Sequence, residues 1–504
     1  MIRLSVLSIL TLSFCAFEMP DNVVKGSPVI NQQKSSSLKI EPYTFETADG
    51  QKVEAELGRL FVPENRGKPQ SKLIELAFVR FKSTAKNPGA PIVYLAGGPG
   101  GSGINTARGS RFALFMAMRQ FSDVIALDQR GTGMSKPSLG CRETLDLPTD
   151  KSPTRDELLR FIRDRSRNCA QYWQDQGVDL SGYNTNESAD DLEDLRKALG
   201  VEKISLWSIS YGTHLALTTI RRHQRSIHKA ILAGIEGPDH TLKLPSNVQQ
   251  YFVDLDRLVK SDPIIGKEIP DLLGLMKTVL ERLEREPVAV ELTDPKTKQK
   301  VKVIINKFVM QYFTATTIGT EATAIYPAVY YAASKGDYSL VASYWLQRVA
   351  KSRIDSAMTY MMDCSSGASM ERRQRIRREA KLTLMEDFAN ADIPDVCDAW
   401  GNPDLGAEFR SPVEASVPVL FISGTLDART PVSNAEEYRK GFRNSQHLII
   451  EGAWHSDPLF LSSPQIKDVM LEFMGDKPLS TTRITLPAVK FHPLVVPLKV
   501  EGIN

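Results

Sequence analysis

The sequence predicts an α/β protein in which a mostly parallel sheet is flanked by helices and interrupted by an inserted, mainly helical cap. From about residue 90 to 238, short apolar runs typical of buried strands alternate with helix-compatible segments. This alternation indicates βαβ units and therefore a parallel sheet. From about 240 to 410 the alternation is lost and helical segments dominate. It resumes with the apolar run 418–424, so we expect the cap to divide one core into two parts.

The individual elements follow from the same patterns, and the first two strands are expected to form an antiparallel ribbon at the sheet edge. Residues 43–239 are predicted to form the first part of the core, 240–410 the cap, 411–478 the second part of the core, and 479–504 an extended C-terminal segment on the surface. In the core, strands are expected at 57–62, 73–81, 91–96, 124–128, 204–207, 229–234, 418–424 and 446–450, and helices at 158–173, 188–199, 434–442 and 464–473. In the cap, helices are expected at 248–260, 272–285, 320–333, 338–350 and 371–388, and a strand pair at 288–293 and 301–305.

Composition and the N-terminus narrow the class of protein. The 504 residues are 42% hydrophobic and 24% charged, with a net charge of +3; no basic stripe is present, which argues against nucleic acid as the main partner. Residues 1–17, with Arg3 before an apolar run, have the pattern of a secretory signal peptide. We therefore expect an exported protein, periplasmic or extracellular, with a linker over 18–42 and no later membrane span. Cys15 leaves a lipid anchor open as the alternative to a free protein.

The remaining four cysteines are an even number, which in an exported chain predicts disulfide bonds. Three pairings are possible, and we favour the two that close short local loops, Cys141 with Cys169 and Cys364 with Cys397. No Cys-x-x-Cys or clustered His/Cys spacing indicates a metal site.

The stretch 203–217, KISLWSISYGTHLAL, predicts a strand, a very tight turn and a helix around Ser210. The turn has the form small-x-Ser-x-Gly, because larger side chains two positions before or after the serine would collide with the strand and the helix. Ser208 stands where a glycine is commoner. Such a turn exposes the serine Oγ at the edge of the sheet and directs backbone N–H groups to the space beside it.

A second glycine-containing segment, GGPGGSG at 97–103, follows the strand expected at 91–96. Its glycines let the backbone approach a ligand closely and leave N–H groups free to donate. A phosphate-binding loop is excluded because the run lacks a Gly-Lys-Ser/Thr ending. A dinucleotide site is disfavoured because no strand with an acidic end follows at the required distance.

A serine at such a turn needs a base and a group that orients the base. Asp427 and His455 each follow a strand in the second core part. The chain order Ser, Asp, His, each on a loop after a sheet strand, is that of the α/β-hydrolase fold. The sequence therefore predicts this fold, with Ser210 as nucleophile, His455 as base and Asp427 as its partner; Asp457 is a less favoured alternative to Asp427.

Five motifs in this order, GGPGGSG, DQRGTGMS, SISYGT, GTLDARTP and GAWHS, resemble the proline iminopeptidase and tripeptidyl aminopeptidase family of serine exopeptidases, above all its exported tripeptidyl-aminopeptidase-like branch. The likeness covers roughly residues 50–475. Ala96 and Ser208 depart from it, where histidine and glycine are usual. The resemblance implies an oxyanion hole formed by the N–H of Tyr211 and an N–H in the Gly97–Gly98 turn, and no metal or organic cofactor.

The same resemblance implies an exported serine aminopeptidase. It would hydrolyse the peptide bond after an N-terminal residue, such as proline, or after a short N-terminal peptide, through an acyl-enzyme. The expected partner is a peptide with a free N-terminus, whose ammonium needs an anion; Glu236, Asp363 and Glu321 are the candidates. The alternative is a carboxylesterase or amidase that uses the same triad on a small acyl substrate, since one scaffold hosts both. A binding protein without catalysis is disfavoured by the complete triad.

Overall fold

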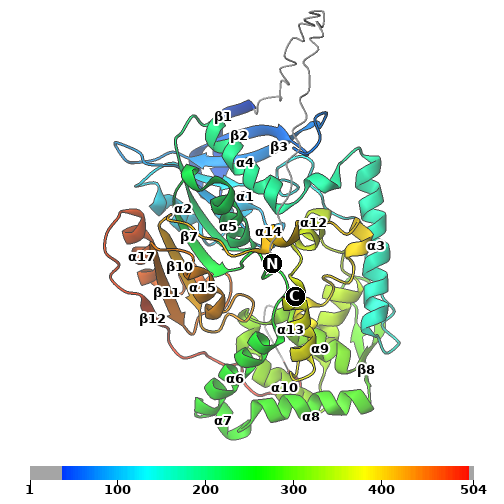
Figure 1. The fold of residues 1–504 in the computed structure, drawn as a ribbon. Helices are drawn as coiled ribbons and strands as arrows, with labels where there is room; N and C mark the ends of the chain where they lie inside the picture. Colours follow the sequence, from blue (N-terminus) through cyan, green and yellow to red (C-terminus); the bar gives the residue numbers. More distant parts are fainter. Residues whose placement is uncertain (1–36, 499–504) are drawn as a thin grey trace, which may run out of the picture. The chain divides into compact units, whose positions relative to one another are not determined.

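The computed structural model describes residues 37–498. The predicted signal peptide, Cys15 and most of the predicted linker lie outside these residues. Within them, a ten-stranded sheet runs in the order β1-β2-β3-β5-β4-β6-β7-β10-β11-β12 (Figure 1). Its strands are β1 (Ser37–Glu46), β2 (Lys52–Pro63), β3 (Leu73–Phe81), β4 (Ile92–Leu95), β5 (Val124–Leu127), β6 (Ile204–Ser210), β7 (Ile227–Ile235), β10 (Val419–Gly424), β11 (Ser445–Glu451) and β12 (Arg483–Thr485).

The sheet is mostly parallel, as predicted. Strands β1, β2, β3 and β5 pair antiparallel to one another, and from β5 through β12 every pairing is parallel. The carboxyl ends of β6, β10 and β11 consequently meet at one edge of the sheet. That edge receives the loops that carry the predicted catalytic residues.

Successive side chains of a strand point to opposite faces, so the sheet separates two hydrophobic cores. Leu206 belongs to one core and its neighbour Trp207 to the other. The first core is covered by α3 (Arg155–Asp175), α4 (Thr185–Ala198), α5 (Tyr211–His223) and α15 (Val432–Arg439). The second is covered by α1 (Gly103–Arg108), α2 (Phe112–Met118), α16 (Pro458–Leu461) and α17 (Pro464–Met474).

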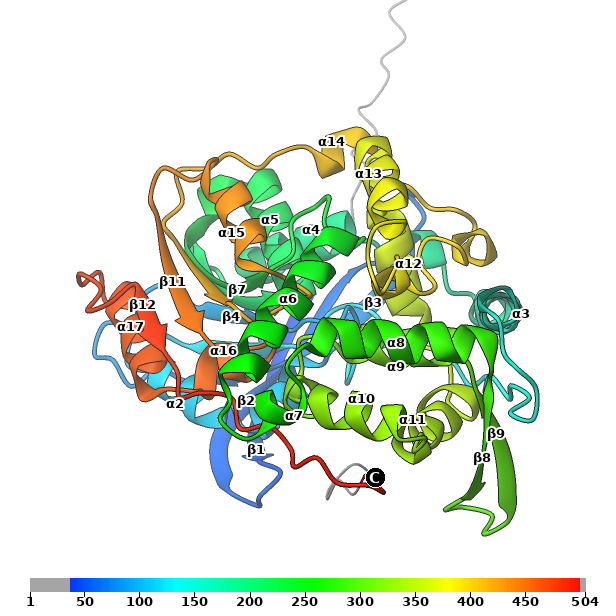
Figure 2. The same ribbon diagram turned by 90° about the horizontal axis from the view of Figure 1, so that it is seen from below.

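The segment predicted as the cap is mainly helical and lies to one side of the sheet (Figure 2). Its longer helices are α6 (Pro245–Ser261), α8 (Leu272–Arg285), α9 (Lys307–Thr317), α10 (Tyr326–Ser334), α12 (Ala357–Ser366) and α13 (Met370–Ala380), with α7 (Ile265–Glu268), α11 (Ser339–Tyr344) and a π-helical turn at Trp345–Ala350 between them. The strands β8 (Val288–Thr293) and β9 (Lys300–Ile305) form a separate antiparallel pair. Within residues 37–498, no helix has the length and apolar character that a bilayer crossing needs.

Two helices expected in the cap were wrong in their bounds. The helix expected at 320–333 is divided into a 3-10 helix, Glu321–Ala324, and α10, because Pro327 starts a new helix in its first turn. The helix expected at 371–388 ends at Ala380, and the N–H of Leu384 donates to the Gln249 side chain rather than to a helical carbonyl.

The predicted linker and the C-terminal extension both contribute strands. Residues 37–42 belong to β1, which pairs with β2 along its whole length and is mostly exposed, so its sequence lacks a buried-strand signal. Residues 483–485 form β12, which adds a parallel strand to the sheet edge with Ile484 buried. The chain beyond β12 continues toward the cap (the red segment in Figure 2): the N–H of His492 donates to Ala324 O at 3.0 Å, and the N–H of Leu498 to Asp337 Oδ2 at 2.7 Å.

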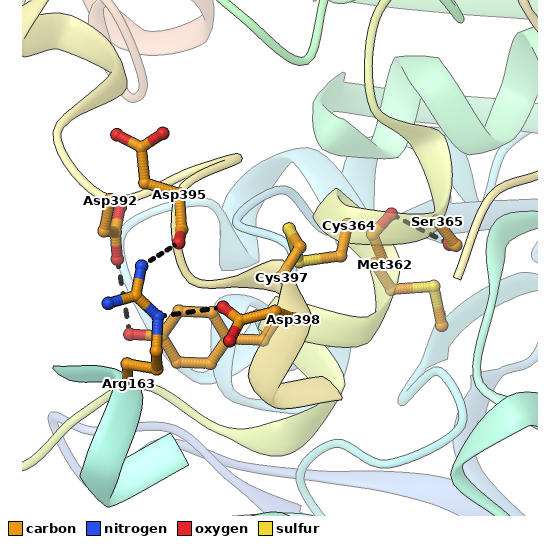
Figure 3. The surroundings of a disulfide bond; sticks show 9 residues. Arg163, Met362, Cys364, Ser365, Asp392, Asp395, Cys397 and Asp398 are labelled. Carbon is orange, nitrogen blue, oxygen red and sulfur yellow. Dashed lines mark hydrogen bonds and ion pairs between the residues drawn. A yellow bond between two sulfur atoms is a disulfide. The ribbon is translucent and has the colours of Figure 1, made fainter. Parts of the chain in front are cut away.

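The disulfides of the described residues are Cys141–Cys169 and Cys364–Cys397, the pairings favoured from the sequence. The second joins α12 to the 3-10 helix Cys397–Trp400 (Figure 3). Beside it, Arg163 of α3 donates to the Asp398 carboxylate at 2.9 Å. The disulfide and the ion pair thus hold α12 and α3 to the same short segment.

Candidate active site

Ser210 is the last residue of β6, and α5 begins at the next residue. Its φ of 55° and ψ of −128° are rare for a residue with a side chain, and such strain is maintained only where the surroundings enforce it. Gly212 explains the small residue after the serine, because a Cβ there would lie 2.2 Å from Leu95 O. Ser208, at the other small position, is fully buried, with its hydroxyl 3.4 Å from Ile231 O.

The predicted acid and base form a hydrogen-bonded pair. His455 Nδ1 lies 2.7 Å from Asp427 Oδ2. The same carboxylate accepts hydrogen bonds from the N–H groups of Arg429 and Thr430, both at 2.9 Å, and from Thr430 Oγ1 at 2.6 Å. Burial raises the pKa of Asp427, but the charge of His455 and these hydrogen bonds outweigh burial, so the pKa lies below its ordinary value. An ionised Asp427 keeps the proton of His455 on Nδ1 and leaves Nε2 to act as the base.

The loop that carries His455 follows β11, but its imidazole reaches the end of β7, the strand next to β6. Ser210 is paired in register with Ile235 of β7. A Cβ built on the preceding residue, Gly234, would lie 3.2 Å from His455 Cε1. The imidazole therefore lies over the end of the strand next to the one that ends in Ser210.

The predicted oxyanion loop lies against the serine. A Cβ at Gly97 would lie 2.9 Å from Ser210 Cβ and 3.6 Å from its Oγ, so this close approach requires glycine. Gly98 has a φ of 123°, which also favours glycine. The N–H of Tyr211 belongs to the first turn of α5, where N–H groups lack intrahelical acceptors. From the cap, Thr359 Oγ1 donates to Pro99 O at 3.0 Å and fixes the loop to α12.

Asp457 is bound elsewhere. Its Oδ1 accepts from Arg111 Nε at 2.8 Å and its Oδ2 from Ser110 Oγ at 2.5 Å. His455 therefore has Asp427, and not Asp457, as its carboxylate partner.

Glu236 and Asp363 both lie near the Tyr211 phenol, but their pKa values shift in opposite directions. Burial raises the pKa of Glu236, but Lys243, whose Nζ donates to it at 2.8 Å, brings the pKa below the ordinary value. Burial and the charge of Glu236 raise the pKa of Asp363 well above its ordinary value, and within residues 37–498 no hydrogen bond reaches its carboxylate. Burial raises the pKa of the Tyr211 phenol, and the charges of Asp363 and Glu236 raise it further, so both acids lie within electrostatic range of that phenol. Glu321 is exposed at the start of its 3-10 helix.

Two further cap acids extend this group and were not found from the sequence. Asp355 and Asp392 both contribute to raising the pKa of Asp363. Burial, followed by the charge of Asp355, raises the pKa of Asp392 to about 6. They come from separate turns of the cap, and no local pattern in the sequence distinguishes them from surface acids.

The comparisons with known proteins agree with this fold. A family model described as alpha/beta hydrolase fold matches residues 90–314, and the chain has the α/β-hydrolase fold. A second model, described as TAP-like protein, matches residues 385–479, so this part of the chain is similar to TAP-like proteins.

Similarity to individual proteins is lower. The chain is 28% identical over 188 residues to serine protease Hip1 of Mycobacterium tuberculosis, a match that covers 36% of each chain. It is 24% identical over 446 residues to a tripeptidyl aminopeptidase of Streptomyces coelicolor, covering 82% of this chain and 79% of that protein. A putative hydrolase of Escherichia coli, YuaR, is 21% identical over 406 residues, covering 76% and 77%. The match to Hip1 thus spans about a third of that relative.

Proposed function

We propose that this protein is an exported serine aminopeptidase that acts on peptides with a free N-terminus through a Ser-His-Asp triad and an acyl-enzyme. The observation that carries the proposal is the Asp427–His455 pair, with its 2.7 Å hydrogen bond, at the sheet edge where β6 ends in the strained Ser210. The relatives named tripeptidyl aminopeptidase and serine protease support a peptidase. The two disulfides and the predicted signal peptide support export to an oxidising compartment.

In this mechanism Ser210 Oγ attacks the scissile carbonyl while His455 Nε2 takes its proton. The carbonyl oxygen becomes an oxyanion, which the N–H groups of Tyr211 and of the Gly97–Gly98 turn stabilise by ~3 kcal/mol per donor. The imidazolium, held by Asp427, then gives its proton to the leaving amine, and the bond breaks to leave an acyl-enzyme. Water, deprotonated by His455, hydrolyses the ester and restores Ser210.

The arrangement of acids supports an aminopeptidase and favours Asp363 as the group that binds the α-ammonium. Glu236 already has a cation, since Lys243 lies 2.8 Å away. Asp363 has no ion-pair partner of its own among residues 37–498, and burial disfavours its charged form. An ammonium group beside Asp363 favours the ionised carboxylate. Asp363 would therefore become charged when the substrate's ammonium group binds next to it.

The test is a hydrolysis panel on purified protein. It contains prolyl, alanyl and tripeptidyl anilides, each with a free or acetylated N-terminus, and short-chain esters. We expect cleavage of the free anilides only, with loss of turnover in Ser210→Ala and a raised KM in Asp363→Asn. The exposed Asp150→Asn serves as the matched control. Hydrolysis of esters alone would identify a carboxylesterase instead, and equal cleavage of acetylated anilides would exclude the ammonium site.

A further inference from the structure

The end of the cap helix α9 contacts both loops that carry the acid and the base. The Arg429 guanidinium donates to Thr316 O at 2.5 Å and to Ile318 O at 3.1 Å. The N–H of His455 donates to Gly319 O at 2.8 Å. Backbone carbonyls of one short cap segment, 316–319, thus accept hydrogen bonds from Arg429, two positions after Asp427, and from His455.

The sequence TTIGT at 316–320 prepares this segment for the contact. Carbonyls at the end of a helix lack intrahelical donors. The hydroxyls of Thr316 and Thr317 donate to carbonyls of the preceding turn, both at 2.7 Å, and that of Thr320 donates to Thr317 O at 2.7 Å, which holds the segment in place. Gly319 has a φ of +64°, and a Cβ there would lie 3.1 Å from the backbone nitrogen of Ala428. Glycine thus allows the cap backbone to reach the Asp427 loop.

Arg429 contacts Asp427 and the cap segment through different atoms. Its backbone N–H donates to Asp427 Oδ1 at 2.9 Å, while its guanidinium binds the end of α9. One half-buried residue therefore touches the acid of the pair and the cap simultaneously. Because the N–H of His455 donates to Gly319 O, the same cap segment holds both the loop that carries Asp427 and the loop that carries His455.

We propose that Arg429 is a positioning residue, which couples the seating of the cap to the alignment of Asp427 with His455. The inference rests on the triad of the proposed function. When the cap is seated, the acid and base loops share one anchor; when the anchor is lost, each loop moves with its own strand. Arg429 contacts no reacting atom, so its effect reaches the chemistry only through Asp427.

The test measures the rate at which a fluorophosphonate labels Ser210, because this reaction needs the activated serine but no peptide subsite. We expect Arg429→Ala to be labelled more slowly by about tenfold or more, as misplacement of catalytic groups predicts, with kcat for the anilide reduced more than KM is raised. Arg429→Lys should keep part of the rate, and added guanidinium ion, but not ammonium, should restore labelling of Arg429→Ala. The control is Arg443→Gln, at an exposed arginine without a partner among residues 37–498.

The outcomes separate the two proposals. Absence of labelling in the wild-type protein overturns the triad and the proposed function with it. Labelling of wild type and Arg429→Ala at equal rates overturns the coupling alone, as does slow labelling in folded Arg429→Ala that guanidinium does not restore. Should Arg429→Ala fail to fold by thermal unfolding, Gly319→Ala tests the contact from the cap side; wild-type labelling of that variant overturns the proposal.

Discussion

The side chain of Thr430 offers a sharp test of how Asp427 is held. Its hydroxyl donates to Asp427 Oδ2 at 2.6 Å and lies 3.1 Å from His455 Nδ1, and the residue is fully buried. Replacing threonine with valine removes the donor and leaves the volume nearly unchanged. The carboxylate keeps the N–H bonds from residues 429 and 430 and the bond from His455.

The size of the effect follows from the kind of bond that is lost. A hydrogen bond to a charged group contributes about 1.5–3 kcal/mol. If the whole of it is expressed in the transition state, where the imidazolium needs an ordered Asp427, kcat/KM falls roughly 10- to 150-fold. Thr430→Ser keeps the hydroxyl and should stay within about threefold of wild type, since it loses only a methyl contact.

The assay compares kcat/KM of wild type, Thr430→Val and Thr430→Ser on the anilide that the wild-type protein cleaves fastest. Thermal unfolding of each variant separates loss of activity from loss of folded protein. If the valine and serine variants have the same kcat/KM, the hydroxyl does not support Asp427 and the reasoning is refuted.

Other consequences concern stability. Replacing both Cys364 and Cys397 with serine opens a link of sequence separation 33 and should lower the free energy of unfolding by about 3.7 kcal/mol; a urea midpoint equal to wild type would contradict this. His214 is buried, and burial lowers its pKa from 6.5 to about 4. The unfolded chain binds the proton more readily, so the contribution of His214 to the free energy of unfolding is fully present above pH 6.5, and ~3 kcal/mol is lost as the pH falls to 4. His214→Gln should flatten the dependence of the unfolding free energy on pH between these values. An unchanged slope would contradict this. Removing residues 487–504 deletes the bonds from His492 and Leu498 to the cap and should speed limited proteolysis within the cap, and cleavage at the wild-type rate would show that the segment does not restrain it.

The parts of the site that the sequence predicted are those fixed by local sterics. At the elbow, Gly212 packs against the Leu95 carbonyl, so the strand–turn–helix geometry leaves a visible constraint on residue size. The glycine loop has the same origin, because Gly97 lies against Ser210. Asp427 and His455 were found through chain order and their positions after strands, which the sheet topology converts into proximity.

The parts that the sequence did not predict depend on backbone atoms or on distant segments. Arg429 binds carbonyls of Thr316 and Ile318, and every residue type has a carbonyl, so the contact leaves no pattern. Asp355 and Asp392 are separated along the chain and meet only through the folding of the cap. Residues 37–42 of β1 were predicted as linker because most of this edge strand is exposed and lacks the pattern of a buried strand.

The cap makes direct contacts with the predicted catalytic residues and the predicted oxyanion loop. Thr359 of α12 donates a hydrogen bond to Pro99 O in the loop that carries the predicted oxyanion donors, and Gly319 O accepts one from the N–H of His455. Asp363, on the same helix as Thr359, is the proposed ammonium site. On this proposal, a substrate whose N-terminus binds Asp363 acts on the helix that also holds the predicted oxyanion loop. On these two proposals, recognition and chemistry depend on the same helix, so substitutions on α12 should change kcat together with KM, whereas a cap that served only as a filter would change KM alone.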